Sequence, residues 1–232
     1  MVVDGRVVPT VVALSHEVER GRLAVAVPGA VDRAVVIGDP RWDRMLASVA
    51  HRPRFRAALG VGEHQDLVVV SSTWRAESLF GSWPDLLRQL LAELPVDRYR
   101  VAAVLHPHLW FAHGPHQVRL WLADCLRSGL VLIPPAEGWA AALIAADVVV
   151  GDHGAVTCYG AALDKPVVLA SFPAEEVAVG SAADRLGSLA PVLHRRASLR
   201  TQLESAQAGF APGRFDPVAE LVTSAPARRS PG

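Results

Sequence analysis

The segment 146–157, Ala-Asp-Val-Val-Val-Gly-Asp-His-Gly-Ala-Val-Thr, has the residue types of a phosphate-binding turn. Its pattern predicts a buried strand that runs through small residues into a helix. The first N–H groups of a helix have no partner within it, and the helix dipole adds partial positive charge there. Small residues let an anion approach such groups closely. The candidate ligands of a diphosphate are therefore Asp152, His153, Gly154, Ala155 and Val156. The alternative is that Asp152 only caps the helix and the small residues only serve packing.

Two further polar segments follow apolar runs. His106 comes directly after the run 100–105 and is the candidate catalytic residue, because a histidine there can donate to a phosphate or to a leaving group. Ser72, Thr73 and Arg75 follow the run 67–70, and their hydroxyl and guanidinium groups suit a phosphate. The alternatives are a hydrogen-bonded edge histidine and a helix-capping loop with a solvated arginine.

Composition limits the class of ligand. The chain has 23 basic and 23 acidic residues, so it offers no broad surface charge for nucleic acid or an anionic membrane. The histidines at 106–116 suggest zinc, but Pro107 breaks a helix there and no cysteine or carboxylate completes the set, so we expect no metal and no cofactor. The longest apolar run, 140–150, is too short to span a bilayer. We expect a cytoplasmic protein whose partner is a small, nucleotide-diphosphate-linked molecule.

Strand and helix patterns alternate along the chain from residue 67. They predict an α/β fold, a doubly wound, mainly parallel, Rossmann-like sheet of five to six strands. The expected strands are 67–70, 100–105, 130–133, 147–150 and 165–170, and the expected helices are 84–93, 116–128, 137–146, 155–163 and 197–208. Ligands of such sheets bind at the carboxyl ends of the strands. The three polar segments should meet there, and Glu137 and Gly138, in the segment 134–139, should frame the base.

The chain divides into three expected parts. Residues 1–36 are expected to be the remnant of a preceding lobe or a link to one, and residues 37–210 the nucleotide-binding α/β lobe. Residues 211–232 are expected to form a largely disordered tail, because the end is polar and proline-rich. The two cysteines, Cys125 and Cys158, are expected to be buried thiols.

The ordered set of short motifs resembles the CDP-glycerol glycerophosphotransferase family. The motifs run from residue 37 to residue 170 and read Gly38-Asp39-Pro40-Arg41-Trp42-Asp43, Ser72-Thr73-Trp74-Arg75, His106-Pro107, the segment 146–155, and Asp164-Lys165-Pro166-Val167. The resemblance implies the C-terminal lobe of a two-lobed GT-B glycosyltransferase fold, and an enzyme type that extends teichoic-acid-type polymers. His106 matches the family's strand-end histidine, Arg75 its loop arginine and Asp43 its entry aspartate.

The segment 152–155 matches the turn that binds the nucleotide diphosphate in that family. The family has two serines where this chain has Gly154 and Ala155, so backbone N–H groups would bind the phosphates here. Leu105 replaces an arginine, and Tyr159 an acidic residue that would hold a ribose. Only about 60 residues precede the strand at residue 67, fewer than an N-terminal catalytic lobe needs.

The resulting hypothesis is a transferase-related protein that binds a nucleotide-activated sugar or polyol phosphate, as a partial enzyme that is either a fragment with an upstream lobe or works with a partner chain. Whether it turns over as an enzyme stays open. The alternatives are a non-catalytic nucleotide-binding or scaffold module and a relative of UDP-N-acetylglucosamine 2-epimerase.

Overall fold

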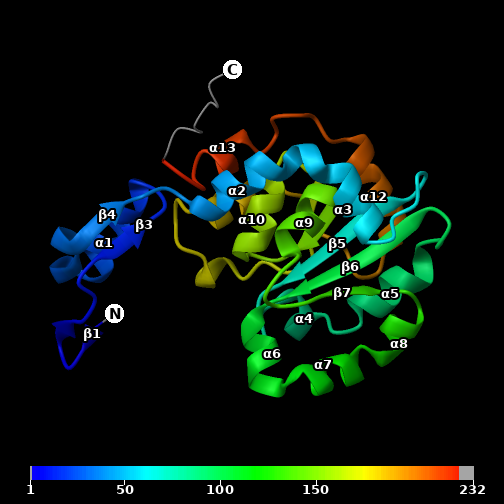
Figure 1. The fold of residues 1–232 in the computed structure, drawn as a ribbon, viewed down its shortest axis with the longest axis horizontal. Helices are drawn as coiled ribbons and strands as arrows, with labels where there is room; N and C mark the ends of the chain where they lie inside the picture. The colour runs from blue at the N-terminus through cyan, green and yellow to red at the C-terminus, as the bar shows by residue number, and fades with distance from the viewer. Residues whose placement is uncertain (1, 225–232) are drawn as a thin grey trace.

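A five-stranded parallel sheet forms the centre of the structure, a computed structural model that describes residues 2–224. The strands lie in the order β7-β6-β5-β8-β9, and all neighbours are parallel (Figure 1). Their bounds are β5 Asp66–Ser72, β6 Tyr99–Leu105, β7 Val131–Ile133, β8 Val148–Gly151 and β9 Val167–Leu169. The order reverses direction after the central strand β5, so ligands are expected beside its carboxyl end. The predicted α/β fold class is confirmed.

Both faces of the sheet are covered, which explains why its strands are almost continuously apolar. Along β5, Leu67 and Val69 face one core and Val68 and Val70 the other, and all four are fully buried. The first core is covered by α2 (Pro40–Ser48), α3 (Arg52–Ala58), α9 (Trp139–Ala145), α10 (Ala155–Ala162) and α11 (Ala182–Leu189). The second is covered by α4 (Leu79–Ser82), α5 (Leu86–Glu93), α6 (Pro107–His113), α7 (Pro115–Trp121), α8 (Ala123–Arg127) and α12 (Leu199–Ala208). Burying one such Val or Leu contributes about 1.5–3 kcal/mol.

Several boundaries differ from the sequence-based expectation. The helix expected at 116–128 is two helices, α7 and α8, which meet at Leu122. The 84–93 helix begins two residues later, as α5, and the short α4 precedes it. The 137–146 helix begins at Trp139, because Gly138 has a φ of 93° and therefore stands outside the helix.

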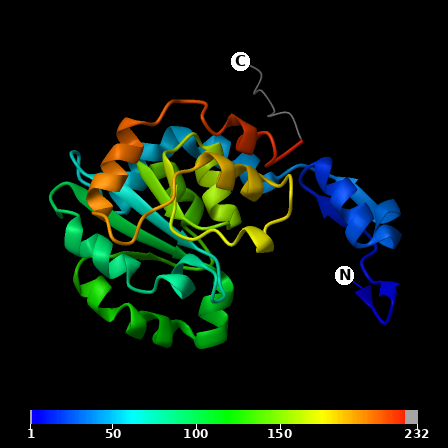
Figure 2. The ribbon, with the colours of Figure 1, turned by 180° about the vertical axis from the view of Figure 1, so that it is seen from behind.

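A small N-terminal unit lies to one side of the sheet (Figures 1 and 2). It consists of a hairpin, β1 (Val2–Val3) and β2 (Arg6–Val7), and of two parallel strands, β3 (Val12–Leu14) and β4 (Ala34–Val36). Helix α1 (Val18–Ala26) and the 3-10 helix η1 (Pro28–Arg33) connect β3 to β4. Its own core is small and consists of Leu14, Leu23, Ala30 and Ala34. None of these strands joins the five-stranded sheet.

The C-terminal segment differs in part from the disordered tail expected at 211–232. Residues 211–224 pack onto the lobe: the short α13 (Asp216–Ala219) contacts α10 and α11. Phe215 and Val218 are almost fully buried there, and this apolar anchoring outweighs the polar residues around it. Residues 225–232 lie outside the described residues. Across the described chain, every helix is too short or too polar to cross a membrane.

Candidate functional site

A cavity of about 330 Å³ lies at the carboxyl ends of β5, β6 and β7, and we refer to it as the edge pocket. It gathers residues from all the polar segments that sequence analysis singled out, together with the first turn of α10. None of its lining residues is acidic. They are Ser71, Ser72, Thr73, Val104, Leu105, His106, Pro107, Pro134, Pro135, Trp139, Gly154, Ala155, Val156 and Tyr159.

Two backbone N–H groups at the start of α10 are without a hydrogen-bond partner among the described residues. Thr157 N and Cys158 N both donate to Gly154 O, at 3.1 and 3.2 Å, and so belong to the helix. The N–H groups of Ala155 and Val156 make no hydrogen bond with any described residue, and both residues line the pocket. Ala155 is also exposed. The positive end of a helix and two free donors therefore meet one cavity.

Asp152 lies beneath this turn and does not line the edge pocket. Its side chain is fully buried. Oδ2 accepts hydrogen bonds from Thr73 N and Thr73 Oγ1, both at 2.8 Å, and from Leu79 N at 3.0 Å, while Oδ1 accepts from Gly154 N at 3.0 Å. The structure thus places Asp152 among the residues that fix the turn, because it ties the end of β8 to the loop after β5.

Gly154 lines the edge pocket, and its lack of a side chain is also required by packing. A Cβ at this position would lie 2.5 Å from Thr73 Cγ2 and 3.0 Å from Asp152 Oδ1. The space that a side chain would occupy at residue 154 is therefore taken by Thr73 and Asp152. Open space lies one residue later, at the exposed Ala155.

The hydroxyl groups of Ser72 and Thr73 are already engaged by the protein. Ser72 Oγ donates to Thr73 O at 3.0 Å and accepts from Phe80 N at 2.9 Å. Thr73 Oγ1 donates a hydrogen bond to Asp152 Oδ2. Both residues line the edge pocket, but their hydroxyl protons hold the loop in place, because buried polar groups require partners.

His106 is oriented by the start of α6. Its Nδ1 accepts a hydrogen bond from His108 N at 3.1 Å and caps that helix, so the proton of the neutral ring is on Nε2. Partial burial lowers the pKa of His106, the nearby His108 lowers it further, and Asp152 acts in the opposite direction. The result is a largely neutral imidazole at neutral pH whose Nε2–H is available to an acceptor.

A smaller hollow of about 220 Å³ adjoins the edge pocket, and Thr73 and His106 line both. We call it the Arg75 hollow. Arg75, His153, Trp74 and Glu176 complete its lining. His153 Nδ1 is buried there without a hydrogen-bond partner. The Arg75 guanidinium lies 4.7 Å from the centroid of the Trp74 ring and forms no ion pair within the described chain.

The backbone of Arg75 is held in an unusual conformation, with a φ of 105°. Ser78 Oγ donates to Arg75 O at 2.7 Å, and Gly81 packs so closely that a Cβ there would lie 2.2 Å from the same oxygen. Strain of this kind persists only where the surroundings fix it. The loop therefore positions Arg75 firmly.

Glu137 and Gly138 are exposed and do not line the edge pocket. The wall near them is formed instead by Pro134, Pro135 and Trp139. The structure therefore brings the segment 134–139 to the edge pocket through Pro134, Pro135 and Trp139, because Gly138 ends the loop and Trp139 is the first residue of α9. The role of this segment toward a base stays a prediction.

Tyr159 is a lining residue that the candidate list did not include. It lies one turn after Ala155 on α10, on the same helix face, and this spacing was the signal in the sequence. Its hydroxyl donates to Asp39, and burial followed by this bond raises its pKa. The rings of Trp139 and Trp42 lie 5.4 and 6.2 Å from its ring centroid. These residues form an aromatic wall.

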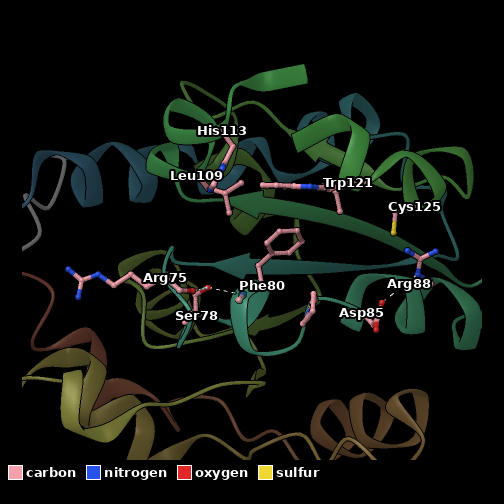
Figure 3. A pocket seen from close by; sticks show the side chains of 13 residues that line it. Arg75, Ser78, Phe80, Asp85, Arg88, Leu109, His113, Trp121 and Cys125 are labelled. Atoms are coloured by element: carbon pink, nitrogen blue, oxygen red, sulfur yellow. Dashed lines mark hydrogen bonds and ion pairs between the residues drawn. The ribbon is translucent and has the colours of Figure 1, made fainter. Parts of the chain in front are cut away.

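A larger cavity of about 510 Å³ lies between α4–α5 and α6–α8 (Figure 3). Its walls carry apolar side chains, among them Phe80, Leu109 and Trp121. Arg75 is its only lining residue from the predicted site, and in Figure 3 the Arg75 side chain points away from it. The free amides of α10 do not line it. Within residues 2–224 no cluster of three or more His, Cys, Asp or Glu side chains could hold a metal ion.

Structural comparison finds the same fold in several proteins of known structure. The wall teichoic acid polymerase TagF, in a variant soaked with CDPG, matches 93% of this chain over 53% of its own, with 15% identity and a TM-score of 0.64. HepE of Anabaena, solved in complex with UDP-glucose, matches 92% over 60% of its own chain, with 15% identity and a TM-score of 0.52. The UDP-GlcNAc 2-epimerase of Neisseria meningitidis, bound to UDP-GlcNAc, matches 91% over 56%, with 16% identity and a TM-score of 0.50.

The chain thus spans little more than half the length of these structures. By sequence, no protein-family model matches it, and no curated protein matches it either. At these identities the comparison establishes the fold. The chain has the Rossmann-like fold of a GT-B-type C-terminal lobe.

Proposed function

We propose that the edge pocket binds a nucleotide-diphosphate-linked small molecule, and that the chain is the nucleotide-binding lobe of a GT-B-type transferase. The observation that carries this proposal is the pair of free N–H groups of Ala155 and Val156, which open into the same cavity as His106. A diphosphate needs several donors and no competing carboxylate, and the described lining of the pocket meets both requirements.

The ligand would lie across the edge of the sheet. Its diphosphate would accept hydrogen bonds from Ala155 N, Val156 N and His106 Nε2. Its base would lie against the wall of Pro134, Pro135 and Trp139, where flat apolar surfaces are available. The transferred group would then point toward the Arg75 hollow, which shares His106 with the edge pocket.

In this proposal His106 is the catalytic residue. A neutral imidazole fixed by its Nδ1 contact can donate from Nε2 to the leaving diphosphate, where negative charge develops as the bond to the transferred group breaks. Arg75 and His153 would bind the phosphate or the acceptor on the other side. Glu176 is the only carboxylate that lines the Arg75 hollow among the described residues.

The finer proposal is a CDP-glycerol glycerophosphotransferase-like partial enzyme. It is supported by the ordered motifs in residues 37–170 and by the fold shared with TagF. Residues 1–36 are then the remnant of a preceding lobe or a link to one. The exposed apolar side chains of Val8, Val11 and Val35 in this unit agree with a surface that once met, or still meets, such a lobe.

A second candidate is a nucleotide-binding module without turnover. The absence of an acidic side chain from the described lining of the edge pocket favours it, because no carboxylate there can act as a base. Both candidates bind the nucleotide. Release of the nucleoside diphosphate from its linked group, with or without an added acceptor, would separate them.

Calorimetric titration with CDP, UDP, GDP and their sugar- or polyol-linked forms tests binding, and Ala155 provides the variant. Ala155→Asp places a carboxylate at the first position of α10, which suits the helix dipole but repels a diphosphate. Ala155→Asn has the same shape without the charge. We expect at least one nucleotide to bind the native protein, Ala155→Asp to weaken it at least about tenfold, and Ala155→Asn to bind within about threefold of native, since about 1.4 kcal/mol corresponds to tenfold. Absence of binding at millimolar nucleotide, or equal affinities for the two variants, would refute the proposal.

A further inference from the structure

A cluster of charged side chains lies at the amino edge of the sheet, opposite the edge pocket. Asp147 precedes β8, and its carboxylate accepts hydrogen bonds from Arg52 Nη2 at 2.5 Å, from Arg56 Nη1 at 2.5 Å and from Leu67 N at 2.7 Å. Lys165 lies just before β9, and the register Val149↔Val167 of the parallel pair β8–β9 brings it beside Asp147; these four residues form a group that we call the amino-edge cluster. The proposed nucleotide site uses none of these residues.

Lys165 is the only lysine of the chain. The other 22 of its 23 basic residues are arginines. An arginine keeps its proton under all ordinary conditions, whereas a lysine can lose it and become a nucleophile. Lys165 is half-buried, and its amino group forms no hydrogen bond or ion pair with a described residue. The neighbouring Asp164 carboxylate accepts from Gly213 N instead.

The charges of the amino-edge cluster are unbalanced. Arg52, Arg56 and Lys165 carry three positive charges, whereas Asp147 and Asp164, the residue before Lys165, supply two negative charges. Arg52 Nε is buried and has no hydrogen-bond partner, so one guanidinium donor still lacks an acceptor. Both features indicate that the cluster would accommodate one more anionic group with oxygen acceptors.

The environment also favours the reactive form of the amine. Burial lowers the pKa of Lys165 to about 8, together with the nearby charges of Arg52 and Arg56, while Asp147 and Asp164 act in the opposite direction. At pH 7.4 about a fifth of the Lys165 side chains are then neutral, compared with about 0.1% for an ordinary lysine. The neutral amine is the species that attacks an electrophile.

We propose that Lys165 is a site of reversible carbamylation by carbon dioxide. The lone pair of Nζ forms a bond to the carbon of CO₂, and one C=O π pair moves onto oxygen. A proton leaves the nitrogen for solvent, so R–NH₂ and CO₂ give R–NH–COO⁻ and H⁺ without any oxidant or reductant.

The product supplies an acceptor to the two arginines of the amino-edge cluster. Arg52 and Arg56 both pair with the single carboxylate of Asp147, and conversion of Lys165 to a carbamate replaces a neighbouring cation with a second anionic group. The carbamate oxygens are acceptors of the kind that Arg52 Nε lacks. This inference does not depend on the function of the edge pocket, because the two sites lie at opposite edges of the sheet.

The test is carbon-13 NMR of the full chain equilibrated with ¹³C-labelled bicarbonate near pH 8. The α-amino group is the only other primary amine and serves as an internal reference. We expect a carbamate carbonyl resonance that is absent from Lys165→Arg, which keeps the positive charge. The resonance should be several-fold weaker in Arg52→Gln and unchanged in Arg54→Gln, an exposed arginine on the same helix.

A second measurement covers the case in which Lys165→Arg fails to fold. The native protein is treated with an alkylating reagent that esterifies the carbamate, digested, and mapped by mass spectrometry. A trapped carboxyl group on the peptide that contains Lys165 supports the proposal. A trapped group on the N-terminal peptide alone, or a carbonyl resonance that persists in a folded Lys165→Arg variant, would overturn it.

Discussion

Asp152 offers the sharpest test of how the edge pocket is built. Its buried carboxylate accepts four hydrogen bonds of 3.0 Å or less, two from Thr73, one from Leu79 N and one from Gly154 N, and a longer one of 3.5 Å from Ser72 Oγ. All of these donors converge on two oxygens from both sides of the turn. Asp152→Asn keeps the shape of the side chain but turns one acceptor into an NH₂ donor.

The loss of stability in Asp152→Asn depends on which hydrogen-bond donors lose their acceptor. In the better orientation, the amide oxygen keeps Thr73 and Leu79 N, and the NH₂ group faces Gly154 N. One buried N–H then lacks a partner, at about 1–3 kcal/mol, and three bonds lose the strengthening that a charged acceptor gives, at about 1 kcal/mol each. The neutral amide is easier to bury than a carboxylate, which offsets part of this loss. We expect a net destabilisation of about 2–4 kcal/mol.

Urea denaturation followed by tryptophan fluorescence measures this loss. The midpoint for Asp152→Asn should fall with no change in the slope, and Tm should drop by about 4–16 °C for a protein of this size. Asp124→Asn is the matched control, since Asp124 is an exposed carboxylate with surface arginine partners. Its midpoint should equal that of the native protein. If Asp152→Asn unfolds at the native midpoint, the carboxylate does not hold the turn as described.

Three further outcomes follow from the same geometry. Gly154→Ala should destabilise the protein by about 1–3 kcal/mol in urea, and Thr73→Ser, which removes the methyl group that the new Cβ meets, should restore part of the loss. The lowered pKa of His106 should rise when a diphosphate binds beside it. Affinity for a nucleotide sugar should therefore increase as pH falls from about 8 to about 6, and it should decline as pH rises through the pKa that His106 has in the complex. Calorimetry of His106→Gln should show no such pH dependence. Tyr99 and Tyr159 are the only tyrosines of the sequence, and both have a raised pKa. Ultraviolet titration should therefore show phenol ionisation above pH 10 in the native protein and near pH 10 after unfolding. The stability that these two side chains contribute is present below about pH 10 and is lost as pH rises through their higher pKa in the folded protein.

The sheet could be predicted from sequence because its strands are buried on both faces. Continuous runs such as 67–70 and 100–105, spaced by amphipathic helices, have few alternatives to a parallel sheet. The carboxyl-end rule then brought His106 and the segment after β8 to one edge without any structural information. Helix boundaries were less accurate, since Gly138 and Leu122 interrupt patterns that look continuous in sequence.

Side-chain roles at the site were harder to predict. Asp152 follows a strand at the edge where ligands bind, but whether such a carboxylate faces a ligand or turns inward depends on donors 79 and 73 residues away, at Thr73 and Leu79. The close packing of Thr73 against Gly154 could not be predicted either, since the two residues are distant in sequence. Phe215 and Val218 fold a segment whose composition suggests disorder, since two buried apolar anchors are enough to hold it.

The most direct test of the central claim is an amide NMR titration with a nucleoside diphosphate. The amide proton resonances of Ala155 and Val156 should shift downfield and saturate together, with the same midpoint as the ring signals of His106. Saturating shifts confined to Phe80 and Trp121, in the larger cavity, would contradict the account, as would the absence of any shift at Ala155 and Val156.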